Sequence, residues 1–256
     1  MFIDTHAHIY TAEFDEDLAA MLDRTTNLDI QHIFMPNVDL DSYPLMMQLA
    51  ADYSFCHPMV GLHPCHVFHD HEEVLSKLEG EMAHHSFAGV GEIGIDLYWD
   101  QTYRKEQIQA FRRQILLAQA HDLPFVIHSR DALDLTIDIV KELQDGTLRG
   151  IFHCFNGTIE QAERIMEIGF MMGIGGVITY KNAGVAEVVA QLPLEYLVLE
   201  TDAPYLSPVP FRGKRNESSY ISIIADKLSE IKNVKKDLIA SFTTNNAKKV
   251  FRDTPF

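Results

Sequence analysis

The sequence predicts an α/β protein of the (β/α)8 TIM-barrel type, and three observations lead to that prediction. Short apolar runs rich in Ile, Val and Phe alternate with longer stretches of helical spacing, which is typical of a parallel sheet covered by helices. About eight such units in 256 residues match the size of this barrel. Six of the runs lead into a His, Glu or Asp, as expected where the carboxyl ends of the strands form one active-site face.

The apolar runs are the predicted strands. In chain order they cover residues 2–9, 32–38, 55–62, 87–95, 124–127, 150–155, 170–178 and 196–200. A doubly wound open sheet is the alternative, and it carries a glycine-rich fingerprint after its first strand. Here the first run contains His6-Ala7-His8 instead, so the barrel is favoured. We expect residues 1–256 to form a single barrel domain.

The intervening stretches are the predicted helices, because their apolar residues recur with helical spacing. Three apolar faces are formed by Ile108, Phe111, Ile115 and Ala118, by Leu135, Ile139 and Leu143, and by Ile221, Ile224, Leu228 and Ile231. Thr158 and Gln161 form a predicted capping box at the start of another helix, which Gly169 ends.

Charge and cysteine content exclude some settings for this chain. With 21 Lys and Arg against 37 Asp and Glu, the formal net charge of −16 argues against broad capture of duplex nucleic acid or an anionic membrane. The three cysteines form no C-x-x-C pair, which favours a reducing, cytoplasmic location. We expect no leader, no membrane association and a monomer, because no segment has the pattern of a signal peptide, a spanning helix or a dimer motif.

The polar residues at the predicted strand ends have the types and spacing of metal ligands. His6 and His8 are two residues apart, so on a strand their imidazoles point to the same side, into the barrel mouth. Four residues from other strand ends complete the set, namely Glu92, His128, His153 and Asp202. Six ligands are too many for one catalytic zinc ion, which uses about three, and they suit two divalent ions. We expect Glu92 to bridge the two ions, because each of its oxygens can bind one of them.

The mixture of imidazole and carboxylate ligands allows Zn, Mn or Mg, and the imidazoles favour Zn or Mn over Mg. A single histidine at a strand end is more often a hydrogen-bonded structural residue. That explanation does not account for six ligand-type residues on one rim. The remaining histidines are expected to have ordinary structural roles, mostly as loop or surface groups, namely His32, His57, His66, His69, His71, His84, His85 and His121.

Several motifs resemble those of the TatD-like metal-dependent hydrolases, often called TatD DNases, along essentially the whole chain. The most specific are E-T-D-A-P-Y-L, which starts at Glu200, and R-G-K-R-N-E, which starts at Arg212. They accompany D-T-H-A-H from residue 4, G-L-H-P from 61, G-E-I-G-I-D from 91, V-I-H-S-R from 126, H-C-F from 153 and T-T-N-N-A from 243. Cys65 and Ser218 depart from the family pattern, and neither is a predicted ligand.

The resemblance implies roles for matching residues. It implies that one ion is held by His6, His8, Glu92 and Asp202, and the second ion by Glu92, His128 and His153. It further implies that Asp202 acts on the attacking water as a base and that His63 contacts a substrate phosphate.

The implied activity is phosphodiester hydrolysis, most specifically by a 3'-5' exodeoxyribonuclease on single-stranded DNA, with RNA as a second substrate class. We expect Arg130 to neutralise phosphate oxygens and Arg212 and Lys214 to contact the phosphate backbone. Tyr98 and Trp99 suit base stacking and packing against the barrel rim equally well. The acidic remainder of the surface favours short, single-stranded or end-bound DNA or RNA.

Two alternative activities and one inactive alternative stay open. A D-aminoacyl-tRNA deacylase would use the same metal site on an ester. A binuclear amidohydrolase or esterase on a small substrate often bridges its ions with a carbamylated lysine on the fourth strand, where this chain has Glu92. A barrel that only binds metal should have lost a ligand, and this chain keeps all six predicted residues.

Overall fold

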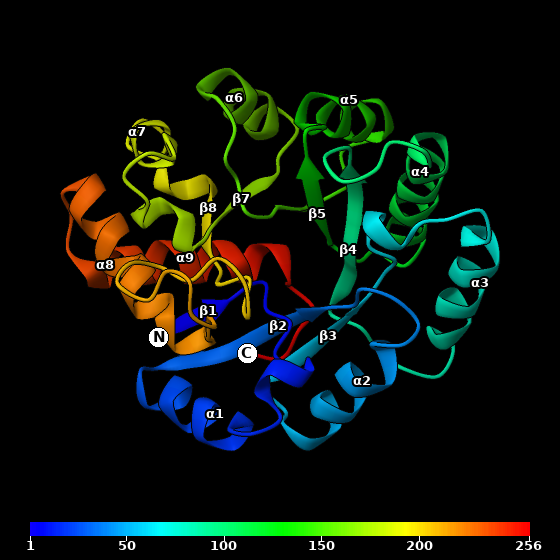
Figure 1. Cartoon of the computed structure of the whole chain (residues 1–256). Helices are drawn as coiled ribbons and strands as arrows, with labels where there is room; N and C mark the ends of the chain where they lie inside the picture. Colours follow the sequence, from blue (N-terminus) through cyan, green and yellow to red (C-terminus); the bar gives the residue numbers. More distant parts are fainter.

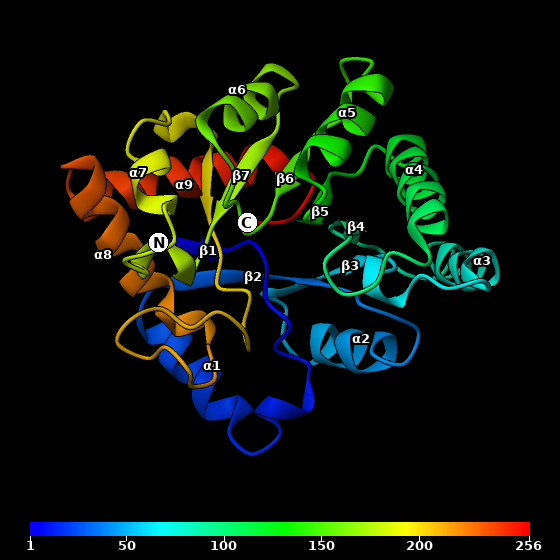
Figure 2. The same ribbon diagram turned by 45° about the horizontal axis from the view of Figure 1, so that its top comes forward.

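The structure is a computed structural model that describes residues 1–256. Eight parallel strands lie in chain order in one sheet, and helices ring them on the outside (Figure 1; Figure 2). The first and last strands approach one another where the Thr5 amide donates to the Leu199 carbonyl at 3.1 Å. The sheet therefore forms a nearly closed barrel, which confirms the predicted fold class and rules out the open doubly wound sheet.

The strands are β1 (Phe2–Asp4), β2 (Ile30–Pro36), β3 (Cys56–Val60), β4 (Gly89–Asp96), β5 (Phe125–Arg130), β6 (Gly150–Phe152), β7 (Met171–Ile174) and β8 (Leu197–Leu199). The helices are α1 (Leu18–Asn27), α2 (Tyr43–Asp52), α3 (His71–Glu81), α4 (Arg104–Ala120), α5 (Leu133–Leu143), α6 (Ile159–Glu167), α7 (Val185–Val189), α8 (Ile221–Lys232) and α9 (Lys236–Val250). None of the helices combines the length and the apolarity that a bilayer-spanning helix needs.

Several strand bounds differ from the predicted ones. The first predicted strand continues to residue 9, whereas β1 ends at Asp4. The chain beyond Asp4 stays extended but changes partners, since Ala7 forms an isolated parallel bridge with Ala203. The fifth strand is longer than predicted and ends at Arg130 instead of residue 127. Hydrophobicity alone misplaces both ends, because the apolar residues continue beyond the end of β1, whereas β5 continues into the polar residues His128, Ser129 and Arg130.

The helix predictions agree with the structure where they name particular residues. The three apolar faces lie on α4, α5 and α8, and Thr158 and Gln161 form both hydrogen bonds of the capping box of α6. Helix α9 closes the barrel end opposite the predicted site. Its Ala247 and Val250, together with Phe251, pack on one residue from each of six strands, namely Ile3, Phe34, Met59, Val126, Ile151 and Val198.

Candidate metal centre

The structure brings all six predicted ligand residues together at the carboxyl ends of the strands. Glu92 and His128 lie on β4 and β5, and the others directly follow β1, β6 and β8. His6, His8 and Glu92 are fully or almost fully buried, whereas Asp202 is 13% exposed and faces the opening.

One oxygen of Glu92 faces the first group of donor atoms. Its Oε2 lies 3.1 Å from His6 Nε2 and 3.3 Å from His8 Nε2, and the two nitrogens are 3.1 Å apart. Asp202 Oδ1 lies 3.5 Å from His6 Nε2 and 3.7 Å from His8 Nε2. Ligands at about 2.0–2.1 Å from one ion lie about 3.0–3.4 Å apart, so these four residues fit a divalent ion.

The other oxygen of Glu92 faces a second group. Its Oε1 lies 2.8 Å from His153 Nε2 and 3.0 Å from His128 Nδ1, and these two nitrogens are 3.4 Å apart. The carboxylate of Glu92 thus stands between two separate sets of donors. This is the arrangement that a bridging carboxylate requires.

A bulge in β4 directs Glu92 into the barrel. Val90 pairs with Phe125 and Ile93 pairs with Ile127, so β4 advances three residues while β5 advances two. The Glu92 amide donates to the Asn37 carbonyl at 3.0 Å, which replaces the ladder bond lost at the bulge. Close packing also matters, because a Cβ at Gly61 would lie 2.7 Å from the Gly91 carbonyl carbon.

Hydrogen bonds fix which nitrogen of His8 faces the centre. The Tyr10 hydroxyl donates to the Pro36 carbonyl at 2.6 Å, so its oxygen accepts from His8 Nδ1 at 3.0 Å. The Nε2 atom of His8 therefore carries a free lone pair toward Glu92. This is the tautomer that a metal ligand needs.

His128 is oriented in the same way by Asp96, a residue to which the sequence analysis gave no role. Asp96 Oδ2 accepts from His128 Nε2 at 2.9 Å, so in the neutral ring that binds a metal the lone pair is on Nδ1, the atom that faces Glu92. Burial by itself lowers the pKa of His128, but the carboxylates of Asp96 and Glu92 outweigh it and raise the pKa.

His63 has the opposite tautomer. The Cys65 amide donates to His63 Nδ1 at 3.1 Å, so the proton sits on Nε2, which lies 3.6 Å from Glu92 Oε1. Although its position beside Glu92 and His128 suits a ligand, His63 presents an N–H to the centre instead of a lone pair. It suits a hydrogen bond to an anionic oxygen.

The electrostatics of the centre favour bound cations. Burial raises the pKa of Glu92, but the imidazoles of His153 and His6 outweigh it and hold the pKa well below its ordinary value. Burial lowers the pKa of His6 to about 3, so its ring is neutral and free to bind metal. Burial also raises the pKa of Asp202 to about 6, which suits an acceptor of protons near neutral pH.

Two further buried carboxylates escaped the sequence analysis. Asp4 accepts from the Thr201 amide at 2.9 Å and from the Thr201 hydroxyl at 2.6 Å, so it ties the segment with His6 to the segment with Asp202. Glu200 accepts from the Cys154 amide beside His153. A carboxylate inside an apolar run was the available signal, since burial of an ionised group requires compensating partners.

The predicted phosphate-binding arginines and lysine come from two segments of the chain, the end of β5 and the loop after β8. Arg130 ends β5, two residues after His128, and stacks on Tyr98. Arg212 stacks on Tyr180, with 4.4 Å from guanidinium carbon to ring centre, and Lys214 is exposed on the same loop. The next basic residue, Arg215, pairs with Asp17 instead and anchors that loop.

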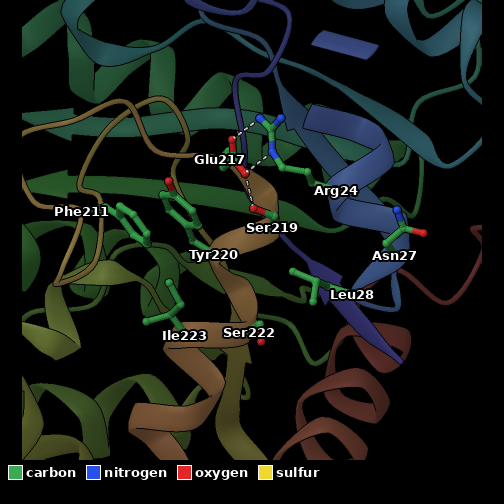
Figure 3. Close-up of a pocket in the computed structure, with 9 residues that line it drawn as sticks. All are labelled: Arg24, Asn27, Leu28, Phe211, Glu217, Ser219, Tyr220, Ser222 and Ile223. Atoms are coloured by element: carbon green, nitrogen blue, oxygen red, sulfur yellow. Dashed lines mark hydrogen bonds and ion pairs between the residues drawn. The ribbon is translucent and has the colours of Figure 1, made fainter. Parts of the chain in front are cut away.

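A separate hollow of about 640 Å³ lies between α1 and the start of α8 (Figure 3). Its charged groups neutralise each other, because Arg24 donates to both oxygens of Glu217 at 3.0 and 2.7 Å. Ser219 donates to the same carboxylate. None of the six predicted ligands lines this hollow, so it is distinct from the candidate metal centre.

Comparisons with known proteins agree with the geometry. A family model described as TatD-related DNase matches residues 3–252. YabD of Bacillus subtilis (strain 168), described as an uncharacterized metal-dependent hydrolase, is 38% identical over 253 residues, which cover 98% of this chain and 99% of that protein. The crystal structure of YjjV, a TatD homologue from Escherichia coli K12, matches with a TM-score of 0.92 and 31% identity over 98% of both chains. A TatD-family hydrolase from Entamoeba histolytica shares the fold, with a TM-score of 0.85, 24% identity and 97% of both chains covered.

Proposed function

The chain belongs to the TatD-related DNase family and is a metal-dependent hydrolase, and from that premise we propose that it cleaves phosphodiester bonds as a 3'-5' exonuclease on single-stranded DNA. RNA is the second substrate class. One observation carries the proposal. The two oxygens of Glu92 face two separate donor groups, as a centre for two divalent ions requires.

Each residue of the centre has a defined task in this chemistry. His6, His8, Glu92 and Asp202 would hold one ion, and Glu92, His128 and His153 the other. When bound, Zn, Mn or Mg ions supply a nucleophilic hydroxide at neutral pH and neutralise charge at phosphorus. Asp202 accepts the proton of the attacking water through the oxygen that does not face the imidazoles. Burial raises the pKa of Asp202 to about 6, so the carboxylate is largely ionised at pH 7 and ready to act as a base.

His63 and the surface charge set the preferred substrate. The Nε2–H of His63 is positioned to donate to a non-bridging phosphate oxygen, which carries the negative charge of a phosphodiester. The net charge of −16 repels the dense charge of long duplexes. Single-stranded or end-bound DNA or RNA therefore fits this surface best, with Arg130, Arg212 and Lys214 as backbone contacts.

A substrate panel tests the proposal. Metal-stripped protein receives Mg, Mn or Zn and is offered single-stranded DNA labelled at either end, duplex DNA, RNA, D-aminoacyl-tRNA and simple esters. We expect single-stranded DNA to be shortened fastest, from its 3' end. Faster internal cutting of duplex would contradict the strand preference, and hydrolysis of only the aminoacyl or simple esters would replace the proposal with one of those activities.

The Asp202→Asn variant tests the assigned base. It should fold normally and lose roughly 10²–10⁴-fold in hydrolysis, since a positioned general base contributes that much. Asp23→Asn, on the exposed face of α1, is the matched control and should retain full activity. Unchanged activity of Asp202→Asn on every phosphodiester would remove Asp202 from its assigned role.

A further inference from the structure

A second groove, of about 630 Å³, is lined in part by Ser129 and Arg130, the two residues that follow the predicted ligand His128. Three stretches of the chain line it, at or beyond the ends of strands associated with predicted ligands. They are Leu97, Tyr98 and Arg104 after β4, Ser129 to Leu135 from the end of β5 into α5, and Asn156, Gly157 and Gln161 after β6. Its volume lies within the roughly 300–1,000 Å³ of small-molecule sites. The groove lies on the His128 side of the centre, because Asp96 accepts hydrogen bonds both from His128 and from the amide of the groove residue Tyr98.

Two exposed aromatic rings lie at this groove and beside it, since Tyr98 lines the groove and Trp99 packs against Tyr98. Trp99 is 72% exposed and Tyr98 is 52% exposed, which is unusual for large aromatic side chains in a chain whose core is otherwise well filled. Their ring centres are 4.9 Å apart with the planes nearly perpendicular. An exposed, fixed indole offers a stacking face to an unpaired base, and such stacking is tolerant of base identity.

A guanidinium lies against these rings. The Arg130 guanidinium carbon is 3.7 Å from the centre of the Tyr98 ring and 5.1 Å from that of Trp99. Its N–H groups form no ion pair within 4.0 Å, and neither do those of Arg104, which also lines the groove. Arg130 is thus held in place by stacking while its donors remain available for a phosphate.

The acidic groups of the groove do not cancel this attraction. Asp134 is already paired, because Arg164 and Gln161 donate to its carboxylate at 2.5 and 3.1 Å. Asp131 is exposed at the rim. In a chain of net charge −16, the groove with Arg104 and Arg130 is a local site where an anion is not repelled.

Asp96 makes the aromatic loop part of the metal centre. Its Oδ1 accepts from the amides of Tyr98 and Trp99 at 3.0 and 3.4 Å, while its Oδ2 accepts from His128 at 2.9 Å. One carboxylate therefore fixes both a predicted ligand and the start of the loop that carries the stacking rings. The loop is ordered before any ligand arrives, which reduces the entropy lost on binding.

We propose that this groove binds the nucleotide next to the scissile phosphodiester, with its base stacked on Trp99 and its phosphate on Arg130. The inference rests on the proposed function and names a substrate subsite for it. The site requires an unpaired base, because a paired base exposes no face to an indole.

Trp99 is the only tryptophan of the chain, so tryptophan fluorescence reports on the surroundings of this one ring beside the groove. The full chain carrying Asp202→Asn, loaded with Mg, is titrated with a thymidine hexanucleotide and with a hexamer of the same backbone that lacks bases. We expect the normal hexamer to quench Trp99 and the abasic hexamer to bind without quenching. Binding of the normal hexamer with unchanged Trp99 emission would overturn the proposal.

Variants separate stacking from phosphate binding. Trp99→Ala should weaken hexanucleotide binding about tenfold or more, whereas Trp99→Phe should retain most of it. Arg130→Gln should weaken the normal and abasic hexamers alike. Leu116→Ala, 51% exposed on α4 outside the groove, is the control and should change neither. Equal affinities of Trp99→Ala and the parent protein would contradict the stacking role.

Failure of this inference differs from failure of the proposed function. If the unsubstituted chain hydrolyses the hexanucleotide but Trp99 emission does not change on binding, the proposed nuclease activity stands and the proposed nucleotide site in the groove is wrong. If the hexanucleotide quenches Trp99 but is not hydrolysed with Mg, Mn or Zn, the nucleotide site in the groove stands and the proposed nuclease activity is wrong.

Discussion

Hydrogen bonds around each imidazole decide what that residue can do in the centre. His8 and His128 present lone pairs because Tyr10 and Asp96 accept their other N–H groups. His63 presents an N–H because a backbone amide already donates to its other nitrogen. The hydrogen-bond partners of each histidine, which are not themselves metal ligands, thus decide whether that histidine can bind a metal or donates a hydrogen bond.

The Asp96→Asn variant tests whether Asp96 determines which nitrogen of His128 can bind a metal. The Asn side chain can still accept from the loop amides, but its NH₂ group would donate to His128 Nε2 and move the ring proton to Nδ1, the atom that faces Glu92. We expect one of the two metal sites to weaken by about 10–100-fold, the usual effect of losing such a partner. Calorimetric titration of metal-stripped protein measures it.

The control is Asp100→Asn, which changes an exposed carboxylate in the same loop and should leave both sites intact. If Asp96→Asn titrates like the parent protein, Asp96 does not position His128.

At the scale of elements, the alternation of strands and helices could be predicted from the sequence because it depends on local periodicity. The convergence of His6, Glu92 and Asp202 followed from the barrel, since its strand ends share one face. The bulge at Glu92 and the partner change after Asp4 could not be predicted, because they depend on contacts with Asn37 and Ala203. Roles for Asp96 and Glu200 required the same long-range information.

The next prediction concerns helix α9, a C-terminal segment for which no separate role was predicted from the sequence. Phe251, just after α9, is fully buried, and its ring stacks on Phe34 of β2 with the ring centres 3.7 Å apart. Phe251→Ala should lower the free energy of unfolding by about 3–5 kcal/mol, as measured by urea denaturation. Phe256→Ala, near the same end but 41% exposed, should cost much less. Equal effects of the two would show that α9 does not close the barrel through Phe251.

In the molecule as a whole, the candidate metal centre and the apolar cluster that closes the barrel lie at opposite ends of the barrel. The carboxyl ends of the strands and the segments that follow them carry the charged and polar side chains of the centre, while the opposite end is sealed by an apolar cluster with α9. His57 lies at this sealed end, where its Nε2 is 2.8 Å from His32 Nδ1 and its side chain is buried. The sealed end therefore contains a titratable group remote from the metal centre.

His57 makes stability depend on pH. Burial, and secondarily the charge of His32, lowers the pKa of His57 from 6.5 to about 4. Above pH 6.5 the residue is neutral in both states, but between pH 6.5 and 4 only the unfolded chain takes up the proton. The free energy of unfolding of metal-free protein should therefore fall by about 3 kcal/mol over that window. His57→Leu should flatten this slope relative to an exposed control, His84→Gln, and an unchanged slope would exclude His57 as its source.

Metal stoichiometry is the most direct test of the central claim, that Glu92 stands between two divalent ions. The full chain is loaded with Zn or Mn, freed of excess metal, and analysed for metal per chain beside Glu92→Gln and the exposed control Glu195→Gln. The account predicts two ions in the parent and the control, and the loss of both from Glu92→Gln. A parent chain that retains no stoichiometric ion, or a Glu92→Gln variant that keeps two, would contradict it.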